Sequence, residues 1–331
     1  MKPSGSEIRC APALHGVLVT YARPELLERT LVQLAAQTRR LDTLVVVDND
    51  PTPVTREIVS RNPARVRALH YIPTPDNLGP AGGLALGMRQ VLCAAAEPDW
   101  VVLLDDDDPP EEPDALEELL KLAAALGAVD SRVAGVGLVG ARFDWRSGRL
   151  VRVRDDELQG PVPVDYLPSG HLPVYRVSAI RDVGGFDERL FFSLDDLEFG
   201  LRLRTAGYSL YAHGTRWMEQ RRKTGRIGAS GGPTIRERTN PSWRRYYSVR
   251  NLIYILMRFG RVRAALRVTL LLCFLKPAIN LLLSPRRGSR HAALGLRAAR
   301  DAWLGRMGRT VEPALEAPAS VPQRGTKASW N

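Results

Sequence analysis

The chain has 331 residues, of which 44% are hydrophobic and 25% charged, a composition typical of a folded globular protein and not of a disordered one. Its three cysteines are far apart and form no CxxC pair, which argues against a disulfide framework or a zinc site and favours a reducing cytoplasm. The opening residues lack the basic flank and long apolar core of a secretory signal, so we expect no export.

The net charge of +11 is unevenly divided along the chain. Residues 1–200 carry 21 Lys and Arg against 31 Asp and Glu, whereas residues 201–331 carry 26 against 5. This division predicts an acidic catalytic half followed by a basic half that meets anionic material. None of the usual nucleic-acid-reading signatures is present, so we expect no nucleic-acid partner. An anionic membrane surface or a phosphate-bearing substrate explains the basic half.

The first half alternates strand and helix signals. Short apolar runs predict buried parallel strands at residues 15–21, 44–47, 66–72 and 100–104, with helices between them from Pro24, over 54–61, and from a glycine-rich turn at 77–88 to about 96. This order predicts an α/β fold with a mostly parallel sheet and helices on both faces. Ligands bind such sheets outside the carboxyl ends of the strands. Residues 20–23, 48–50 and 105–108 are therefore expected to converge there.

The second half is more mixed. We predict a helix at 113–126, a strand at 133–139, an irregular stretch at 142–165, a helix at 197–206, a strand at 208–212, and helices at 252–259, 262–283 and 291–304. A basic, Gly- and Pro-rich stretch at 219–243 suits a mobile loop. The expected organisation is a flexible N-terminus (1–13), an α/β domain (14–245), a basic helical C-terminal region (246–309) and a disordered tail (310–331).

Four consecutive carboxylates, Asp105–Asp108, follow the buried strand at 100–104. They repel one another unless a cation neutralises them. Alternate side chains of an extended segment point the same way, so Asp105 and Asp107 are candidates to share one Mg²⁺ or Mn²⁺, which in turn binds a diphosphate. The alternative is an acidic loop that caps the following helix, and the run alone does not decide between the two.

Two other acidic positions also admit two interpretations. Asp48 ends a predicted strand, where it is a candidate to bind a base or ribose, but the residues after it favour a simple Asx-turn. Asp195 and Asp196 begin a predicted helix, where negative charge stabilises the N-terminus. Capping is the simpler role for Asp195, whereas Asp196 is a candidate general base that deprotonates an acceptor hydroxyl.

Taken together, the motifs resemble the family-2 glycosyltransferases, which are inverting enzymes with the GT-A fold. The resemblance covers about residues 14–251 and is closest to bacterial galactofuranosyl- and rhamnosyltransferases. Each motif is loose alone, but their order and spacing are specific. They are VTYARP at 19–24, VVVDND at 45–50, NLGPAGG at 77–83, LLDDDD at 103–108, SGHLPVYR at 169–176, VGGFDERLFFSLDDLEFGLRLRTAGY at 183–208 and YYSVRN at 246–251.

The resemblance implies that residues 14–245 are a catalytic domain, with a nucleotide-sugar half at 14–108 and an acceptor half at 109–245. It also implies roles for several of the motifs. Asp105 and Asp107 would chelate the metal, Asp196 would be the catalytic base, and Gly184–Phe186 would shape the acceptor side. The implied reaction is direct displacement, in which the acceptor oxygen attacks the anomeric carbon and the nucleoside diphosphate leaves. The residues implied to bind the nucleotide-sugar are Thr20, Tyr21, Arg23, Asp48, Asn77, Gly83 and Asp106.

One position departs from the family pattern. Many relatives carry a metal-binding histidine twelve or thirteen residues after the glycine that matches Gly207, where this chain has Glu219 and Gln220. Glu219 is a candidate to replace that histidine, and a metal held by fewer protein groups is the alternative. The neighbouring Arg221, Arg222 and Lys223 either clamp a phosphate or form a solvated basic loop.

The apolar stretch at 268–283 is 16 residues long and interrupted by Lys276 and Pro277, which is short for a bilayer-spanning helix. Arginines surround it. We expect a helical segment on the inner face of the cell membrane, attracted by anionic lipids, while a helical hairpin buried against the catalytic domain is the alternative.

The expected function is sugar transfer from a UDP- or dTDP-sugar to a hydroxyl of a glycan or lipid-linked acceptor in cell-envelope assembly. A small soluble metabolite, such as an antibiotic precursor, is the alternative acceptor. A nucleotidyltransferase would need a basic glycine-rich loop near the first strand, which residues 19–30 lack. A non-catalytic nucleotide-sugar-binding protein is the competing class.

Overall fold

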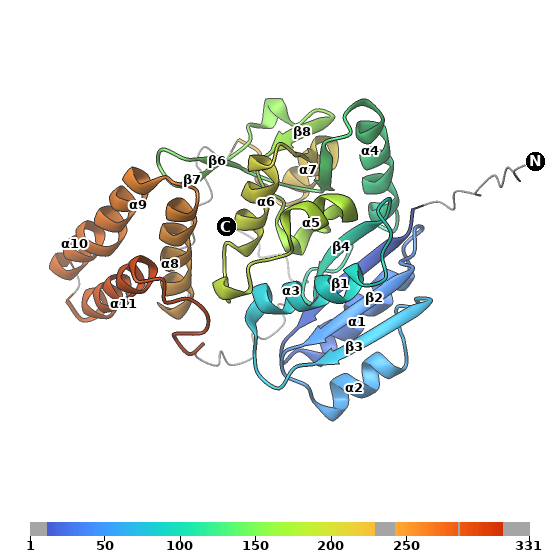
Figure 1. Cartoon of the computed structure of the whole chain (residues 1–331), viewed down its shortest axis with the longest axis horizontal. Helices are drawn as coiled ribbons and strands as arrows, with labels where there is room; N and C mark the ends of the chain where they lie inside the picture. Colours follow the sequence, from blue (N-terminus) through green and yellow to red (C-terminus); the bar gives the residue numbers. More distant parts are fainter. Residues whose placement is uncertain (1–11, 229–241, 284, 314–331) are drawn as a thin grey trace, which may run out of the picture.

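The computed structural model describes residues 12–228, 242–283 and 285–313. The predictions of a flexible N-terminus and a disordered tail therefore fall almost entirely outside the described residues. A mostly parallel sheet with helices on both faces forms the body of the molecule, and a group of C-terminal helices lies at one side of it (Figure 1).

The first half of the chain has the predicted alternation of strands and helices. Pro24 stands in the first turn of its helix, where its missing N–H is not needed, and the next helix is capped by the Thr52 side chain, which accepts from the Thr55 amide. The elements in order are β1 (Leu14–Thr20), α1 (Pro24–Ala35), β2 (Thr43–Asp48), α2 (Pro53–Ser60), β3 (Ala68–Pro73), α3 (Gly79–Leu92) and β4 (Trp100–Asp105).

The second half completes the sheet and adds a small hairpin. It contains α4 (Ala115–Val129), β5 (Val133–Gly137), β6 (Arg142–Asp144), β7 (Arg149–Val151), η1 (Asp155–Glu157), β8 (Pro161–Val164), η2 (Ser169–His171), β9 (Val174–Arg176), α5 (Val177–Val183), η3 (Glu188–Leu190), α6 (Asp195–Thr205), β10 (Ser209–His213) and α7 (Gly214–Lys223). The prediction that 142–165 is irregular is wrong, because β6 and β7 pair there and β8 joins the main sheet.

The main sheet has eight strands in the order β3-β2-β1-β4-β9-β5-β10-β8. β9 runs antiparallel to both of its neighbours, and β8 is antiparallel to β10, while the remaining pairs are parallel. Alternate strand residues face opposite sides: Val17 packs in the core under α3, and Leu18 packs in the core under α1 and α4. The predicted fold class is confirmed.

The basic stretch after residue 219 begins as a helix, so the prediction of a mobile loop is wrong for residues 219–223. Trp217 and Arg221 lie one helical turn apart on the inner side of α7 and are 9% and 5% exposed. The Arg221 guanidinium donates to the Val153 carbonyl at 2.9 Å and pairs with Asp155. These inward contacts fix the helix. Residues 229–241 lie outside the described part of the chain.

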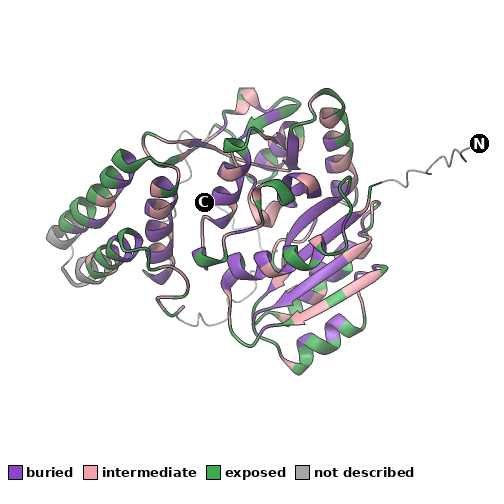
Figure 2. Ribbon diagram, in the orientation of Figure 1, coloured by how far each residue is buried: buried purple, intermediate pink, exposed green. Residues whose placement is uncertain are grey.

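The C-terminal helices are α8 (Ser242–Arg258), α9 (Val262–Thr269), a π-helical turn η4 (Leu270–Leu275), α10 (Lys276–Leu283) and α11 (Pro285–Trp303). α8 begins ten residues earlier than predicted, because Tyr246 and Tyr247 pack in a third core with Phe191 and Leu197. Exposed residues lie along the outer sides of α9 and α11, whereas much of α8 is buried (Figure 2). Within the described ranges, no helix has both the length and the apolar character needed to cross a membrane.

Candidate active site

The register of three parallel strands sets the centre of the candidate site. Thr20 at the end of β1 is paired with Asp48 at the end of β2, and its neighbour Val19 is paired with Asp105 at the end of β4. Since adjacent strands lie about 4.8 Å apart, the backbones of Asp48 and Asp105 are separated by about 10 Å, with β1 between them. The predicted convergence of the strand ends is therefore present in the fold.

Asp106 holds the loop between β1 and α1. It is 3% exposed, and its carboxylate accepts from the Thr20 hydroxyl at 2.8 Å and from the Tyr21 amide and an Arg23 nitrogen at 3.3 Å each. The Asp106 carbonyl accepts from the Thr30 hydroxyl at 2.8 Å. These bonds fix the loop, whose Ala22 lies at φ 54°. Asp106, Thr20, Tyr21 and Arg23 thus form one connected group beside the strand ends.

Asp105 and Asp107 lie on either side of Asp106 in the chain. Carboxylate oxygens of Asp105, Asp106 and Asp107 lie within 4.8 Å of one another. Burial, followed by the charges of Asp107 and Asp106, raises the pKa of Asp105 to about 7. Arg23 lies 2.5 Å from Asp107 Oδ2 and offsets part of the negative charge. Hard carboxylate oxygens at this spacing suit Mg²⁺ or Mn²⁺, and a bound cation would offset the burial and the repulsion that favour a proton on Asp105.

Asp48 forms the Asx-turn that the residues after it predict. It is 1% exposed, and its Oδ1 accepts from the Asp50 amide at 3.0 Å in an Asx-turn. Its Oδ2 accepts from the Tyr71 hydroxyl on β3 at 2.7 Å, and burial together with this carboxylate raises the pKa of Tyr71. Tyr71 was not foreseen, because nothing local in the sequence pairs it with Asp48. The carboxylate is therefore oriented from two sides at the strand end.

The glycine-rich turn before α3 is tied to the end of β2. Asn77 Oδ1 accepts from the Gly79 amide at 2.8 Å, and Asn49 bonds the backbone of Leu78 and Gly79 at 3.2 Å. Gly83 lies further along the helix, where a Cβ would approach Val19 Cγ1 to 2.6 Å. Gly83 therefore lets α3 pack closely on β1, and Asn77 shapes the turn beside the strand ends.

The other side of the site is the N-terminus of α6. Asp195 and Asp196 are its first two residues, preceded by Leu194 in a left-handed conformation. Asp195 is 7% exposed and Asp196 is half-buried. Burial raises the pKa of both carboxyls, and the charges of Asp196 and Asp105 raise that of Asp195 further. The influence of Asp105 on Asp195 indicates that α6 begins close to the aspartate cluster.

A short turn, Ser169–His171, lies between the two groups of aspartates. The Ser169 amide donates to Asp196, and His171 Nδ1 lies 3.0 Å from Asp108 Oδ2. A Cβ at Gly170 would lie 3.4 Å from Asp108 Oδ2 and 3.7 Å from Asp105 Oδ2. Sequence reasoning assigned no role to this turn, because its position depends on β9 entering the sheet beside β4. The turn fixes the distance between the candidate base and the candidate metal ligands.

In α7, Glu219, Arg221 and Lys223 each pair with a residue outside the aspartate run. Glu219 lies 3.7 Å from Arg216, which also pairs with Asp114 at 2.7 Å. Among the residues that the structure describes, Glu219 is not part of the group of gathered carboxylates. The interpretation of Arg221 as a phosphate clamp is wrong, since its guanidinium is directed inward to Asp155. Lys223 pairs with Glu112 at 2.5 Å.

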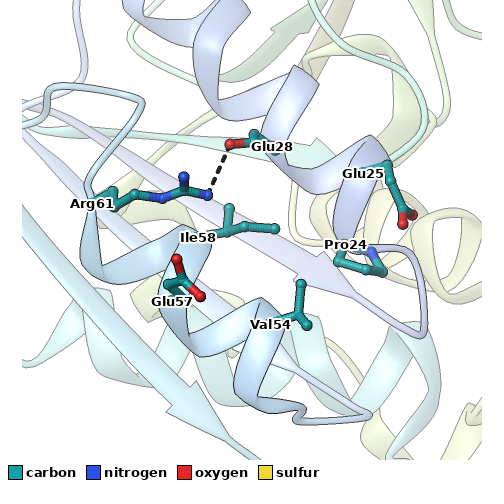
Figure 3. A pocket seen from close by; sticks show the side chains of 7 residues that line it. All are labelled: Pro24, Glu25, Glu28, Val54, Glu57, Ile58 and Arg61. Carbon is teal, nitrogen blue, oxygen red and sulfur yellow. Dashed lines mark hydrogen bonds and ion pairs between the residues drawn. The ribbon is translucent and has the colours of Figure 1, made fainter.

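A hollow of about 250 Å³ lies between α1 and α2 (Figure 3). Glu25, Glu28 and Glu57 line it around the apolar side chain of Ile58, and Glu28 pairs with Arg61 at 3.0 Å. Three carboxylates repel a diphosphate, so this hollow does not suit a nucleotide. The strand ends are the better candidate for a phosphate-bearing ligand.

The chain is similar in sequence to known glycosyltransferases. A family model described as "Glycosyl transferase family 2" matches residues 17–184. Galactofuranosyltransferase GlfT1 from Mycobacterium tuberculosis is 37% identical over 207 residues, which cover 59% of this chain and 66% of the relative, slightly less than two thirds of its length. N-acetylglucosaminyl-diphospho-decaprenol L-rhamnosyltransferase from the same organism is 31% identical over 245 residues, covering 65% of this chain and 78% of the relative.

Two solved structures are similar in fold. A mannosyltransferase from Pyrobaculum calidifontis, solved with GDP-Man and Mn²⁺, matches with a TM-score of 0.50 and 17% identity, over 90% of this chain and 88% of that one. GalNAc-T7, solved with UDP, GalNAc and Mn²⁺, matches with a TM-score of 0.51 and 12% identity, over 75% and 48%. At these identities the likeness concerns the fold alone, and it agrees with the predicted GT-A architecture.

Proposed function

Because the chain belongs to glycosyl transferase family 2, we propose that it transfers a sugar from a UDP- or dTDP-sugar to an acceptor hydroxyl. The observation that carries the proposal is the strand register that sets Asp48 and Asp105 on either side of Thr20. It supports a nucleoside diphosphate lying across the ends of β2, β1 and β4, where ligands of open α/β sheets bind.

In this proposal Asp105 and Asp107 hold a divalent cation. Asp106 already accepts from Thr20, Tyr21 and Arg23. Asp107 pairs with Arg23 through Oδ2, and Asp105 Oδ1 accepts from the Asp106 amide, so Asp105 Oδ2 and Asp107 Oδ1 would meet the cation. A bound Mg²⁺ or Mn²⁺ would supply charge neutralisation for the diphosphate leaving group. Arg23, whose side chain is 43% exposed, is positioned to bind an oxygen of the same diphosphate.

The remaining roles belong to the chain's own residues. Asp48 and Asn77 bind the nucleoside side of the donor, together with Thr20, Tyr21 and the turn that precedes Gly83. Asp196 accepts the proton of the acceptor hydroxyl as its oxygen attacks the anomeric carbon and the bond to the diphosphate breaks, with inversion at that carbon. Asp196 is the more exposed of the two residues that begin α6 and is therefore better placed than Asp195 to meet an incoming acceptor. A raised pKa suits a group that must take up a proton near neutral pH.

We place the acceptor in the cell envelope, as a glycan or lipid-linked glycan at the cytoplasmic face of the membrane. The names of the relatives support this class, and so does a surface of the C-terminal helices. On α9, η4 and α10 a row of large apolar side chains is between 46% and 61% exposed, with Arg263 and Arg267 exposed beside it: Leu266, Leu270, Phe274, Leu275 and Ile279. Apolar side chains flanked by arginines suit an anionic lipid surface.

The test is transfer by the purified chain from a panel of UDP- and dTDP-sugars, including galactofuranose and rhamnose donors, to lipid-linked acceptors, with products identified by mass spectrometry. Transfer is expected with at least one donor. The Asp196→Asn variant should bind that donor normally and lose turnover by about 10²–10⁴-fold. Donor binding without transfer by the wild type, with glycan, lipid-linked and small-metabolite acceptors alike, would instead favour a non-catalytic binding protein.

A further inference from the structure

Two polar side chains on α8, Arg250 and Asn251, are each 0% exposed. They are the last two residues of the YYSVRN motif, and neither has a role in the chemistry described above. A buried guanidinium is expensive unless its donors are satisfied, so its partners indicate what the pair holds in place. Those partners are the backbone of the segment that leads into α6.

The segment between η3 and α6 has an unusual backbone. Phe191 has φ 61° and ψ −62°, and the Phe192 amide donates to the Leu190 carbonyl at 2.7 Å, which together define a γ-turn of the rare, strained form. Ser193 and Leu194 follow with φ 72° and 63°. None of the three is a glycine, and such conformations persist only where the surrounding structure holds them.

Asn251 makes three of the hydrogen bonds that keep this backbone in place. Its amide nitrogen lies 3.0 Å from the Leu190 carbonyl, 2.9 Å from that of Phe192 and 2.7 Å from that of Ser193. The Arg250 Nε donates to Asn251 Oδ1 at 3.0 Å, which fixes the amide with its nitrogen toward the segment. Arg250 Nη2 also donates to the Leu190 carbonyl at 2.9 Å.

We propose that Arg250 and Asn251 are positioning residues that hold the 190–194 segment so that Asp196 faces the acceptor. This inference rests on the proposed function of Asp196. The segment ends at Leu194, the residue before α6 and two residues before Asp196, so a change in its backbone rotates or shifts the base. Its Phe191 carbonyl also accepts from the Ala81 amide at 3.3 Å, which joins the same segment to the start of α3 on the donor side.

The same network of hydrogen bonds includes residues near the C-terminal end of the described chain. Arg250 Nη1 donates to the Gly308 carbonyl at 2.6 Å and to the Thr310 hydroxyl at 3.0 Å, and the Gly308 amide donates to the Arg189 carbonyl at 2.6 Å. The residues that follow α11 therefore orient Arg250, which orients Asn251. By this route the C-terminal helical region supports the catalytic geometry as well as offering an outer surface.

The test compares Asn251→Ala with Leu256→Ala. Leu256 is also fully buried on α8 and packs in the same core, but it makes none of these bonds to the segment. Asn251→Ala is expected to lower kcat by about 10–100-fold, as loss of an outer-shell orienting group does, with the KM for the donor changed by less than about twofold. Leu256→Ala should lower the melting temperature at least as much and leave kcat within about threefold. Equal effects of the two variants on kcat would overturn the proposal.

A second measurement tests the positioning role of Asn251 whether or not the protein transfers sugar. Hydrogen exchange of the segment covering residues 188–197, followed by mass spectrometry, should be faster in Asn251→Ala than in Leu256→Ala, and exchange in β5 should be equal in both. If the wild type transfers no sugar, the proposed function is wrong. The exchange measurement still tests whether Asn251 holds the segment, because it does not depend on activity. Equal exchange of the 188–197 segment in the two variants would overturn the positioning role.

Discussion

The raised pKa of Asp105 makes metal binding depend on pH in a defined way. The carboxyl ordinarily titrates near 3.8, and burial with the adjacent charges of Asp107 and Asp106 raises its pKa to about 7. Below pH 7 a cation must displace a proton to use both Asp105 and Asp107. We therefore expect the apparent Kd for Mn²⁺ to fall by about tenfold for each pH unit between 5 and 7, about 100-fold in all, and to level off above about 7.5.

The stability of the metal-free protein should change in the opposite sense. Since the folded state holds a proton on Asp105 that the unfolded state releases near pH 3.8, the folded state binds more protons between the two pKa values. Its free energy of unfolding should therefore decrease as the pH rises from about 4 to 7, and added Mn²⁺ should restore most of that loss at pH 7.

Calorimetric titration with Mn²⁺ at half-unit steps of pH measures the first effect, and thermal melts with and without Mn²⁺ measure the second. The matched control is Asp105→Asn, which keeps the shape of the side chain and removes its titration. In that variant Mn²⁺ should bind weakly and with little pH dependence between 6 and 7. An Mn²⁺ affinity that is constant from pH 5.5 to 7 in the wild type, or equal in wild type and variant, would refute this reasoning.

Three further predictions concern other parts of the fold. Thr20→Val removes a 2.8 Å hydrogen bond to the buried Asp106 carboxylate and should lower the free energy of unfolding by about 1.5–3 kcal/mol in urea titrations; an unchanged midpoint would contradict the anchoring role. Gly79→Ala forces a Cβ to within 2.1 Å of the Phe191 carbonyl at φ 69° and should destabilise by more than Gly225→Ala, which has φ 65° and nothing within 4 Å and should cost only about 1–2 kcal/mol. Leu270→Asp changes a residue that is 61% exposed. It should lower the affinity for anionic vesicles at least tenfold, measured by co-sedimentation, and leave the melting temperature within about 2 °C. An unchanged affinity would contradict the membrane proposal.

The parallel core was predictable because its signals are local. The apolar runs that became β1, β2 and β4 are buried on both faces, and the carboxylates that follow two of these strands must share one edge of a parallel sheet. The later insertion of β9 was not predictable in the same way. It has only three residues, and its place between β4 and β5 depends on contacts with strands far away in the chain.

The same distinction holds within the site. The aspartate run identified a candidate cation site. Which aspartate anchors the β1–α1 loop and which ones face a cation depends on hydrogen bonds that no spacing rule reveals, such as those from Thr20 and Arg23 to Asp106. Composition was misleading after residue 219, where a basic stretch suggested a loop but Arg221 packs inward. The bonds that Asn251 makes to the backbone before α6 also lie outside what sequence alone indicates.

We expect the ends of β2, β1 and β4 to form one site that binds a nucleoside diphosphate and a cation together. Titration of UDP and dTDP into the wild type and the Asp107→Asn variant, each with and without Mn²⁺, measures whether they do. At least one nucleotide should bind the wild type tenfold or more tightly with Mn²⁺ than without, and this gain should disappear in the variant. Nucleotide binding that is the same with and without Mn²⁺, or the same in both proteins, would contradict it.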